Sequence, residues 1–330
     1  MIQQNKKYQS FETFINSSLY SQQDVEINMS YTYVGKIDAS GLGSALANRT
    51  NLSNLAIDVS YDQIGDQGAS DLGSAFKNCA NVSNLTLNLT DNQIGNEGIS
   101  NLCSGLANCT NLSNLTLYLR QNQIGEFGGL CLGSALANCT NLSNLKLYLS
   151  KNQIGDRGVS GLGSKLANCT NLSDLTLELI GSKIGDEGVQ GLGSAFSNCT
   201  NLSNLKLLLS GNQIYAFGAQ GLGSGLANCT NLLNLTLDLS VNQIGTLGAS
   251  ELGSALANCT NLSNLTLNLM YNQIGAIGAL SLSSGLANCT KLLYLKLGLN
   301  FNEINESQQQ WKVKNNCLKL KNLVVLQIQF

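Results

Sequence analysis

Leucines and polar residues alternate along short stretches of this chain, and each stretch is followed by a segment with a different spacing. In residues 111–140, Leu115, Leu117 and Leu119 alternate with residues of polar character, the period of two that predicts a half-buried strand. After a turn, Leu132 and Leu136 lie four residues apart, as on one face of a helix. The pattern therefore predicts a strand, a turn and a short helix.

The same unit recurs every thirty residues from about Ser30 to about Ile304. One strand leucine recurs at this spacing as Leu85, Leu115, Leu145, Leu175, Leu205, Leu235, Leu265 and Leu295. A fixed period of this length marks a solenoid, in which each unit buries its apolar face against its neighbours. Because a helix links each strand to the next, the strands must be parallel. We expect an α/β horseshoe of about ten repeats, with strands on the concave face and helices on the convex face.

The ends of the chain depart from the repeat, so we expect three regions: a helical cap in residues 1–22, repeats in 23–304, and a divergent last repeat or C-terminal cap in 305–330. The helical spacing of Phe11, Phe14, Ile15 and Leu19 should cover a first strand at residues 25–29, and a membrane anchor is the alternative. Near the other end, the repeat's core positions are reproduced one residue late, at Val313, Cys317, Leu320, Leu323 and Leu326. We expect a last strand at residues 326–330, whose open edge is closed by its own helix or by a partner.

Composition narrows the class of protein. Hydrophobic residues make up 43% and charged residues 12%, with a formal net charge of −2, which suits a packed protein without the basic field of a nucleic-acid binder. No stretch approaches the roughly eighteen apolar residues of a membrane span. The first residues do not resemble a secretory signal. Frequent Asn-x-Ser/Thr sequons beside the strands would carry sugars in a secreted protein and keep the units apart, so we expect a cytoplasmic location.

The sequence gives little support for a catalytic or metal-binding function. Histidine is absent, which removes the commonest general base and metal ligand. Eight of the eleven cysteines recur once per repeat, at Cys79, Cys109, Cys139, Cys169, Cys199, Cys229, Cys259 and Cys289. A recurring small apolar side chain indicates a reduced packing position rather than a disulfide or a metal ligand. We therefore expect no enzyme activity, no cofactor and no metal.

The strand leucines, the Asn-x-Ile-Gly turn (residues 122–125) and the following helix resemble the leucine-rich repeat family, specifically its ribonuclease-inhibitor-like class. The near-identical copies also look like the leucine-rich arrays of ciliate proteins. In that family a repeated asparagine forms a ladder by bonding the backbone of adjacent turns. The resemblance assigns this role to Asn92, Asn122, Asn152, Asn212, Asn242, Asn272 and Asn302, with Asp62 and Ser182 as exceptions.

Function is expected where the copies differ. Neighbouring parallel strands lie about 4.8 Å apart, so Tyr118 and Tyr148 should be neighbours on the concave face. With Arg120, Lys146 and Lys151 they would form a cluster of the residue types enriched at binding hot spots; neutral drift on a repeated surface is the alternative. Further partner-binding candidates on the same face are Glu178, Lys206 and Leu208.

A second candidate surface is the turn that leads into the helix. Polar residues occupy one position of this turn in several repeats, but the position is apolar at Phe127, Phe217, Leu247 and Ile277. Three of these fall near Val241, Tyr271 and Phe301, and an exposed apolar strip of this kind would mark a protein contact. The alternative is that these side chains fold back and cover the ridge. Trp311, the single tryptophan, is expected to be exposed on the last helix.

Three functions are compatible with these features. The first is a non-catalytic scaffold that binds a protein partner through the concave face or the turn ridge. The second is a structural subunit of a large cytoskeletal or ciliary assembly, docking through its C-terminal edge and Trp311. The third, implied by family resemblance alone, is a GTPase-activating regulator, which would require specific polar residues on one turn ridge and typically an acidic tail that is not found here.

Overall fold

The computed structural model describes residues 6–9, 13–14, 23–31, 41–46 and 51–330. The chain divides into two compact units, Met1–Ile154 and Gly155–Phe330, and each is described by itself.

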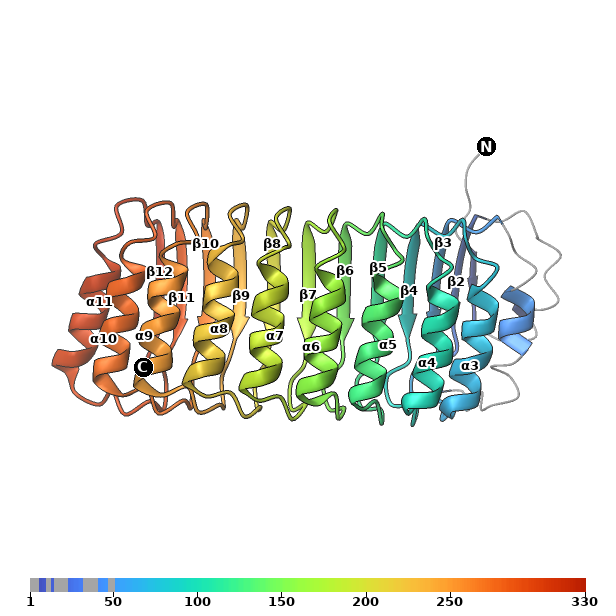
Figure 1. Ribbon diagram of the computed structural model, residues 1–330, viewed down its shortest axis with the longest axis horizontal. Coiled ribbons are helices and arrows are strands. Elements are labelled where there is room, and N and C mark those ends of the chain that lie inside the picture. The colour runs from blue at the N-terminus through green and yellow to red at the C-terminus, as the bar shows by residue number, and fades with distance from the viewer. Residues whose placement is uncertain (1–5, 10–12, 15–22, 32–40, 47–50) are drawn as a thin grey trace. The chain divides into compact units, whose positions relative to one another are not determined.

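The first unit is a parallel sheet whose strands pair in chain order, with helices on one face (Figure 1). Its strands are β1 (Lys6–Tyr8), β2 (Asp24–Asn28), β3 (Asn54–Asp58), β4 (Asn84–Asn88), β5 (Asn114–Tyr118) and β6 (Asn144–Tyr148). Its helices with defined bounds are α3 (Gly65–Phe76), α4 (Asn96–Leu106) and α5 (Glu126–Leu136). Residues 41–46 are also helical.

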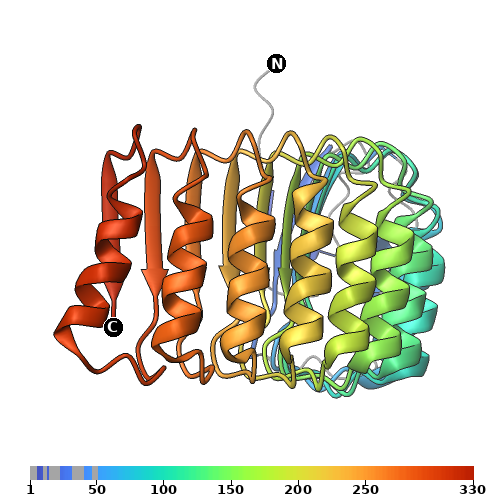
Figure 2. The same ribbon diagram turned by 60° about the vertical axis from the view of Figure 1, so that its left-hand side comes forward.

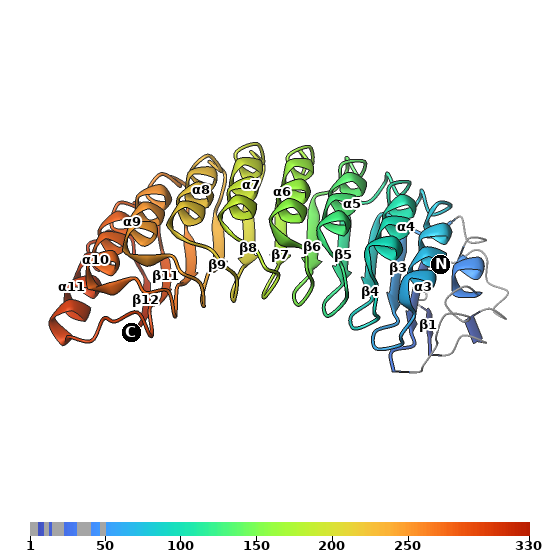
Figure 3. The ribbon, with the colours of Figure 1, turned by 60° about the horizontal axis from the view of Figure 1, so that its bottom comes forward.

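The second unit repeats this layout, and its helices and strands form two separate layers (Figures 2 and 3). Its strands are β7 (Asp174–Glu178), β8 (Asn204–Leu208), β9 (Asn234–Asp238), β10 (Asn264–Asn268), β11 (Tyr294–Gly298) and β12 (Val325–Gln329). Its helices are α6 (Gly155–Leu166), α7 (Asp186–Phe196), α8 (Ala216–Ala227), α9 (Gly245–Leu256), α10 (Gly275–Leu286) and α11 (Ser307–Cys317). The predicted solenoid of parallel strands alternating with helices is therefore confirmed within each unit.

The core lies between the sheet and the helices. On β5, Leu115 and Leu117 point inward and are buried, whereas Asn114, Thr116 and Tyr118 lie on the opposite face. Helix leucines such as Leu132 close the core from the other side. Since the core leucines recur at the same places, β2 to β6 and β7 to β11 pair with an offset of thirty residues, as in Leu85 with Leu115.

The ends differ from the sequence-based expectation. A strand that the sequence did not predict, β1, lies within the segment expected to be a helical cap, and it pairs with β2 through Tyr8 and Ile27. Phe14 is buried and meets the Tyr8 ring edge-on at 5.1 Å, while Phe11, Ile15 and Leu19 lie outside the described residues.

At the other end, β12 spans Val325–Gln329, one residue earlier than predicted. Leu326 pairs with Leu295, an offset of thirty-one residues, as expected from the late core positions. Among the described residues, no strand pairs with β12 on the side away from β11.

Candidate functional site

The turn asparagines connect successive turns through buried hydrogen bonds. Asn242 is representative: its Nδ2 donates to the carbonyl oxygens of Leu239, at 3.0 Å, and of Leu209 in the preceding turn, at 3.1 Å. Its Oδ1 accepts from the Ile214 N–H at 3.1 Å. The amide thereby supplies partners for backbone groups that have no water available, so these residues act as structural elements rather than as a binding surface.

The other predicted ladder residues are buried in the same way. Their side-chain amides bond the backbone of adjacent turns at Asn92, Asn122, Asn152, Asn212, Asn272 and Asn302. At the equivalent position Ser182 is fully buried, and its hydroxyl has no hydrogen-bond partner within the described part of the chain.

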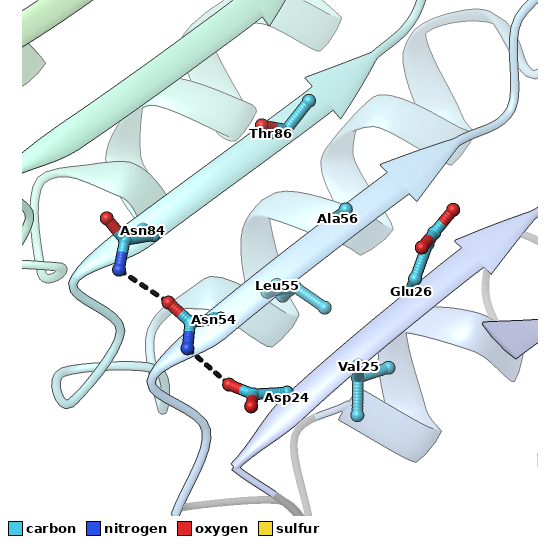
Figure 4. Close-up of a pocket in the computed structure, with 8 residues that line it drawn as sticks. All are labelled: Asp24, Val25, Glu26, Asn54, Leu55, Ala56, Asn84 and Thr86. Carbon is cyan, nitrogen blue, oxygen red and sulfur yellow. Dashed lines mark hydrogen bonds between the residues drawn. The ribbon is translucent and has the colours of Figure 1, made fainter. Parts of the chain in front are cut away.

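A second amide ladder runs along the sheet face that carries no helices, and it was missed at the sequence level. In the first unit, Asn114 donates to Asn84 Oδ1 at 2.6 Å, Asn84 donates to Asn54, and Asn54 donates to the Asp24 carboxylate (Figure 4). In the second unit the series runs from Asn264 through Asn234 and Asn204 to Asp174. The signal was present as the asparagine that opens each strand.

A shallow hollow of about 180 Å³ lies over the first strands of this face (Figure 4). Asp24, Glu26 and Asn54 line it around the small side chain of Ala56. Glu26 also pairs with Lys7 at 2.9 Å. Within the described ranges, no group of three or more histidine, cysteine or acidic side chains is arranged to hold a metal ion.

The aromatic-basic cluster (Tyr118, Arg120, Lys146, Tyr148 and Lys151) lies on the open face of β5 and β6 and on the turns that follow. The two tyrosine rings stack with centroids 4.6 Å apart and an interplanar angle of 3°, because Tyr118 and Tyr148 are in register. The Arg120 guanidinium carbon lies 4.6 Å from the centre of the Tyr148 ring, within the range of a cation–π contact. Lys146 and Lys151 are exposed.

The remaining concave-face candidates belong to the second unit. Lys206 is exposed and Leu208 is half-buried on β8, where Leu208 pairs with Glu178 of β7. Glu178 is only 6% exposed, so it offers little surface to a partner. Lys206 and Leu208 are among the residues that line a hollow of about 320 Å³, and Gly298 lines it as well.

The apolar ridge of the second unit comprises two rows of exposed apolar side chains. One row occupies the same position near the starts of α8, α9 and α10: Phe217, Leu247 and Ile277, with exposed fractions of 65%, 58% and 72%. The other row occupies the turns after the strands: Val241, Tyr271 and Phe301, with exposed fractions of 52%, 48% and 64%. Tyr271 and Phe301 stack at 4.1 Å.

The turn row also has an unusual backbone. Val241, Tyr271 and Phe301 have φ values of 55°, 55° and 59°, in the left-handed region that is most unfavourable for a β-branched residue such as Val241. Glycine occupies the same position at Gly181 and Gly211. The same conformation occurs at Tyr61, Asp91, Gln121 and Lys151, so it belongs to the repeat turn. What distinguishes the ridge is the exposure of its apolar side chains.

A similar aromatic pair, missed at the sequence level, lies in the first unit, where Tyr31 and Tyr61 stack at 4.5 Å. At the end of the second unit, Trp311 is 62% exposed on α11. This helix buries only Val313 and Cys317 among its own residues, and Leu326 and Ile328 of β12 stay half-buried.

Comparisons with known proteins agree with this architecture. The family described as Leucine Rich repeat matches residues 83–103, 141–163, 231–253 and 261–283, each covering a strand and much of the following helix. No curated protein sequence matches the chain. No described helix has the length and apolar content needed to traverse a lipid bilayer.

Two solved structures illustrate the likeness. An internalin (inlF) from Listeria monocytogenes is 20% identical with a TM-score of 0.49, over 94% of this chain and 81% of the internalin. An internalin C2 (inlC2) from the same organism is 22% identical with a TM-score of 0.46, over 87% of this chain and 92% of that chain. The chain is thus similar to the leucine-rich repeat family over four segments, which are copies of one unit that continues between them.

Proposed function

We propose that this protein is a non-catalytic scaffold that binds a protein partner, and that the apolar ridge of the second unit is the main contact. The observation that carries the proposal is the exposure of six apolar side chains at two positions of successive repeats. Exposed apolar patches of this kind on a folded domain mark contacts with other proteins, because water excluded from them stabilises the complex.

The aromatic-basic cluster supports a second contact on the concave face. Its stacked tyrosines are held in place before any partner arrives, so binding would order few additional side chains. Tyrosine and arginine are also the residue types that dominate binding energy at interfaces.

We also propose a class for the repeats and a cellular location for the protein. We assign the repeats to the ribonuclease-inhibitor-like class, because a helix of eleven or twelve residues follows each strand from β3 to β11 along the described chain. The many sequons beside the strands favour a cytoplasmic location, because sugars there would separate adjacent repeats.

The alternative is a subunit of a larger cytoskeletal or ciliary assembly that docks through α11 and β12, favoured by the exposure of Trp311. A GTPase-activating role fits less well, because the ridge where polar residues would be needed is apolar in the second unit.

The test compares partner recovery by three variants of the purified full chain in an extract of its source, quantified by cross-linking mass spectrometry. The ridge variant carries Leu247→Ser and Ile277→Ser. Its matched control carries Gln67→Ser and Glu97→Ser, at the same repeat position in α3 and α4. The cluster variant carries Tyr118→Ala, Tyr148→Ala and Lys146→Glu.

We expect the ridge variant to lose its dominant partner at least about tenfold, since two large apolar contacts are removed, while the control retains it. Retention by both the ridge and cluster variants, with cross-links concentrated at Lys312–Lys321, would instead assign the contact to the C-terminal end.

A further inference from the structure

Consecutive helices of this protein approach each other closely at one glycine position. A Cβ added to Gly73 would lie 2.4 Å from the Asn101 carbonyl oxygen, and a Cβ added to Gly193 would lie 2.4 Å from that of Gly221. Real Cβ atoms do not approach backbone atoms so closely, so the helix spacing there depends on glycine. In α4 this position is occupied by Cys103, and α5 cannot approach α4 in the same way.

The wider spacing leaves a hollow of about 280 Å³ between α4 and α5. Cys103, Leu130 and Cys131 are among the residues that line it, and each departs from the commonest residue at its repeat position. Cys103 and Cys131 also lie outside the recurring column of cysteines, as does Cys317. Three unusual residues are thus concentrated around one opening.

A second replacement of this glycine shows how such a gap is filled elsewhere. In α10 the position is Ser283, and the Asn316 side-chain amide of α11 donates to its hydroxyl at 3.2 Å. Between α4 and α5 two thiols lie in the corresponding region instead.

The two thiols line the same opening, Cys103 from α4 and Cys131 from α5. The glycines equivalent to Cys103 direct their Cβ position at the next helix, as Gly73 does at α4. The glycine equivalent to Cys131 directs its Cβ position at the preceding helix, as Gly191 does at Ser160. Burial raises the pKa of the Cys103 thiol, and the nearby Cys131 raises it further. Cys103 is 3% exposed, whereas Cys131 is partly exposed and accessible to a reagent.

We propose that Cys103 and Cys131 are a modification site that forms a reversible disulfide across the α4–α5 groove, with a low-molecular-weight disulfide such as oxidised glutathione as the oxidant. The Cys131 thiolate attacks one glutathione sulfur, forming a mixed disulfide and releasing one glutathione thiolate. The Cys103 thiolate then attacks the Cys131 sulfur and releases the second glutathione. Both cysteines are oxidised, the glutathione disulfide is reduced to two thiols, and the two cysteine protons pass to the released thiolates.

The test uses the folded full chain, which is incubated with oxidised glutathione, denatured in an alkylating agent, digested and analysed by mass spectrometry. We expect one cross-linked peptide pair joining Cys103 to Cys131, lighter by two hydrogens than the separate peptides. The remaining cysteines should be alkylated, because they are buried away from the oxidant. If the protein is reduced before alkylation, all eleven cysteines should be alkylated.

Two variants test which cysteines form the cross-link. Cys131→Ser should abolish the cross-link, whereas Cys139→Ser, a change in the recurring column beside the groove, should retain it. A link between Cys103 and Cys139, or a stable glutathione adduct on Cys131 while Cys103 is alkylated, would overturn the proposal.

Discussion

At the scale of single residues, asparagine serves two purposes in each repeat. The turn asparagine is buried and bonds the backbone of adjacent turns, as Asn242 does. The asparagine that opens most of the strands lies on the sheet face and bonds the side chain at the same position of the preceding strand, as Asn234 does with Asn204. The same residue type recurs because its amide both donates and accepts, which lets one side chain connect two repeats.

We expect Asn242→Ala to lower the free energy of unfolding by about 1–3 kcal/mol, because the buried Ile214 N–H would lose its acceptor. The Leu209 and Leu239 carbonyl oxygens would each keep one hydrogen bond, from Asn212 and Asn272. Urea denaturation followed by circular dichroism measures the change. Gln243→Ala, at the exposed neighbouring residue, is the control and should be close to neutral. Equal effects of the two substitutions would argue against a structural role for the turn amide.

At the scale of helices, glycine sets the spacing of the outer layer. Gly193 of α7 and Gly225 of α8 oppose each other, and a Cβ on Gly225 would lie 1.9 Å from the Gly193 carbonyl oxygen. In α4 the residue equivalent to Gly193 is Cys103, and in α5 the residue equivalent to Gly225 is Ala135. The methyl group of Ala135 is tolerated because α4 and α5 are farther apart.

Gly225→Ala should therefore destabilise the protein by about 1–3 kcal/mol, the usual cost of overpacking, although alanine normally favours a helix by up to about 1 kcal/mol over glycine. Thermal unfolding of the purified variant shows whether the substitution lowers or raises the stability. In the same helix, Gly221→Ala meets only the flexible Gln190 side chain and should be neutral or slightly stabilising. A stabilising effect at both glycines would mean that the helices separate without cost.

At the scale of the whole molecule, the recurring cysteines form a buried column in each unit. Burial raises the pKa of the Cys229 and Cys289 thiols to about 12 and that of Cys199 to about 11, from an ordinary value of 9.0, and neighbouring cysteines add to the effect. The folded state thus holds these protons more tightly than the unfolded state does.

Stability should consequently be unaffected by these thiols below pH 9 and should fall as the pH rises from 9 toward 11–12, where the folded thiols ionise. Each thiol contributes a slope of about 1.4 kcal/mol per pH unit in this window. Comparing the pH dependence of unfolding for the wild type and Cys229→Ala isolates one such slope from the titration of lysines and tyrosines. Parallel curves for the two proteins would show that the Cys229 thiol ionises as readily in the folded state as in the unfolded state.

The sequence by itself determined the repeating unit, the alternation of strands and helices, and the residues of the core. Leucines such as Leu115 and Leu117 could be placed correctly because each repeat packs against copies of itself, so the period in sequence is also the period in space. The stacking of Tyr118 on Tyr148 followed the same logic, since residues thirty apart lie side by side.

Only the tertiary structure decided the features that depend on departures from that period. Strand β1 was not predictable, because three residues carry too little pattern and its pairing with β2 is a tertiary contact. The α4–α5 groove follows from the distance between two helix backbones, which one side chain at Cys103 changes. The apolar ridge could be anticipated from residue types, but the exposure of Ile277 and the strained turn at Val241 are properties of packed neighbours and backbone conformation rather than of residue identity.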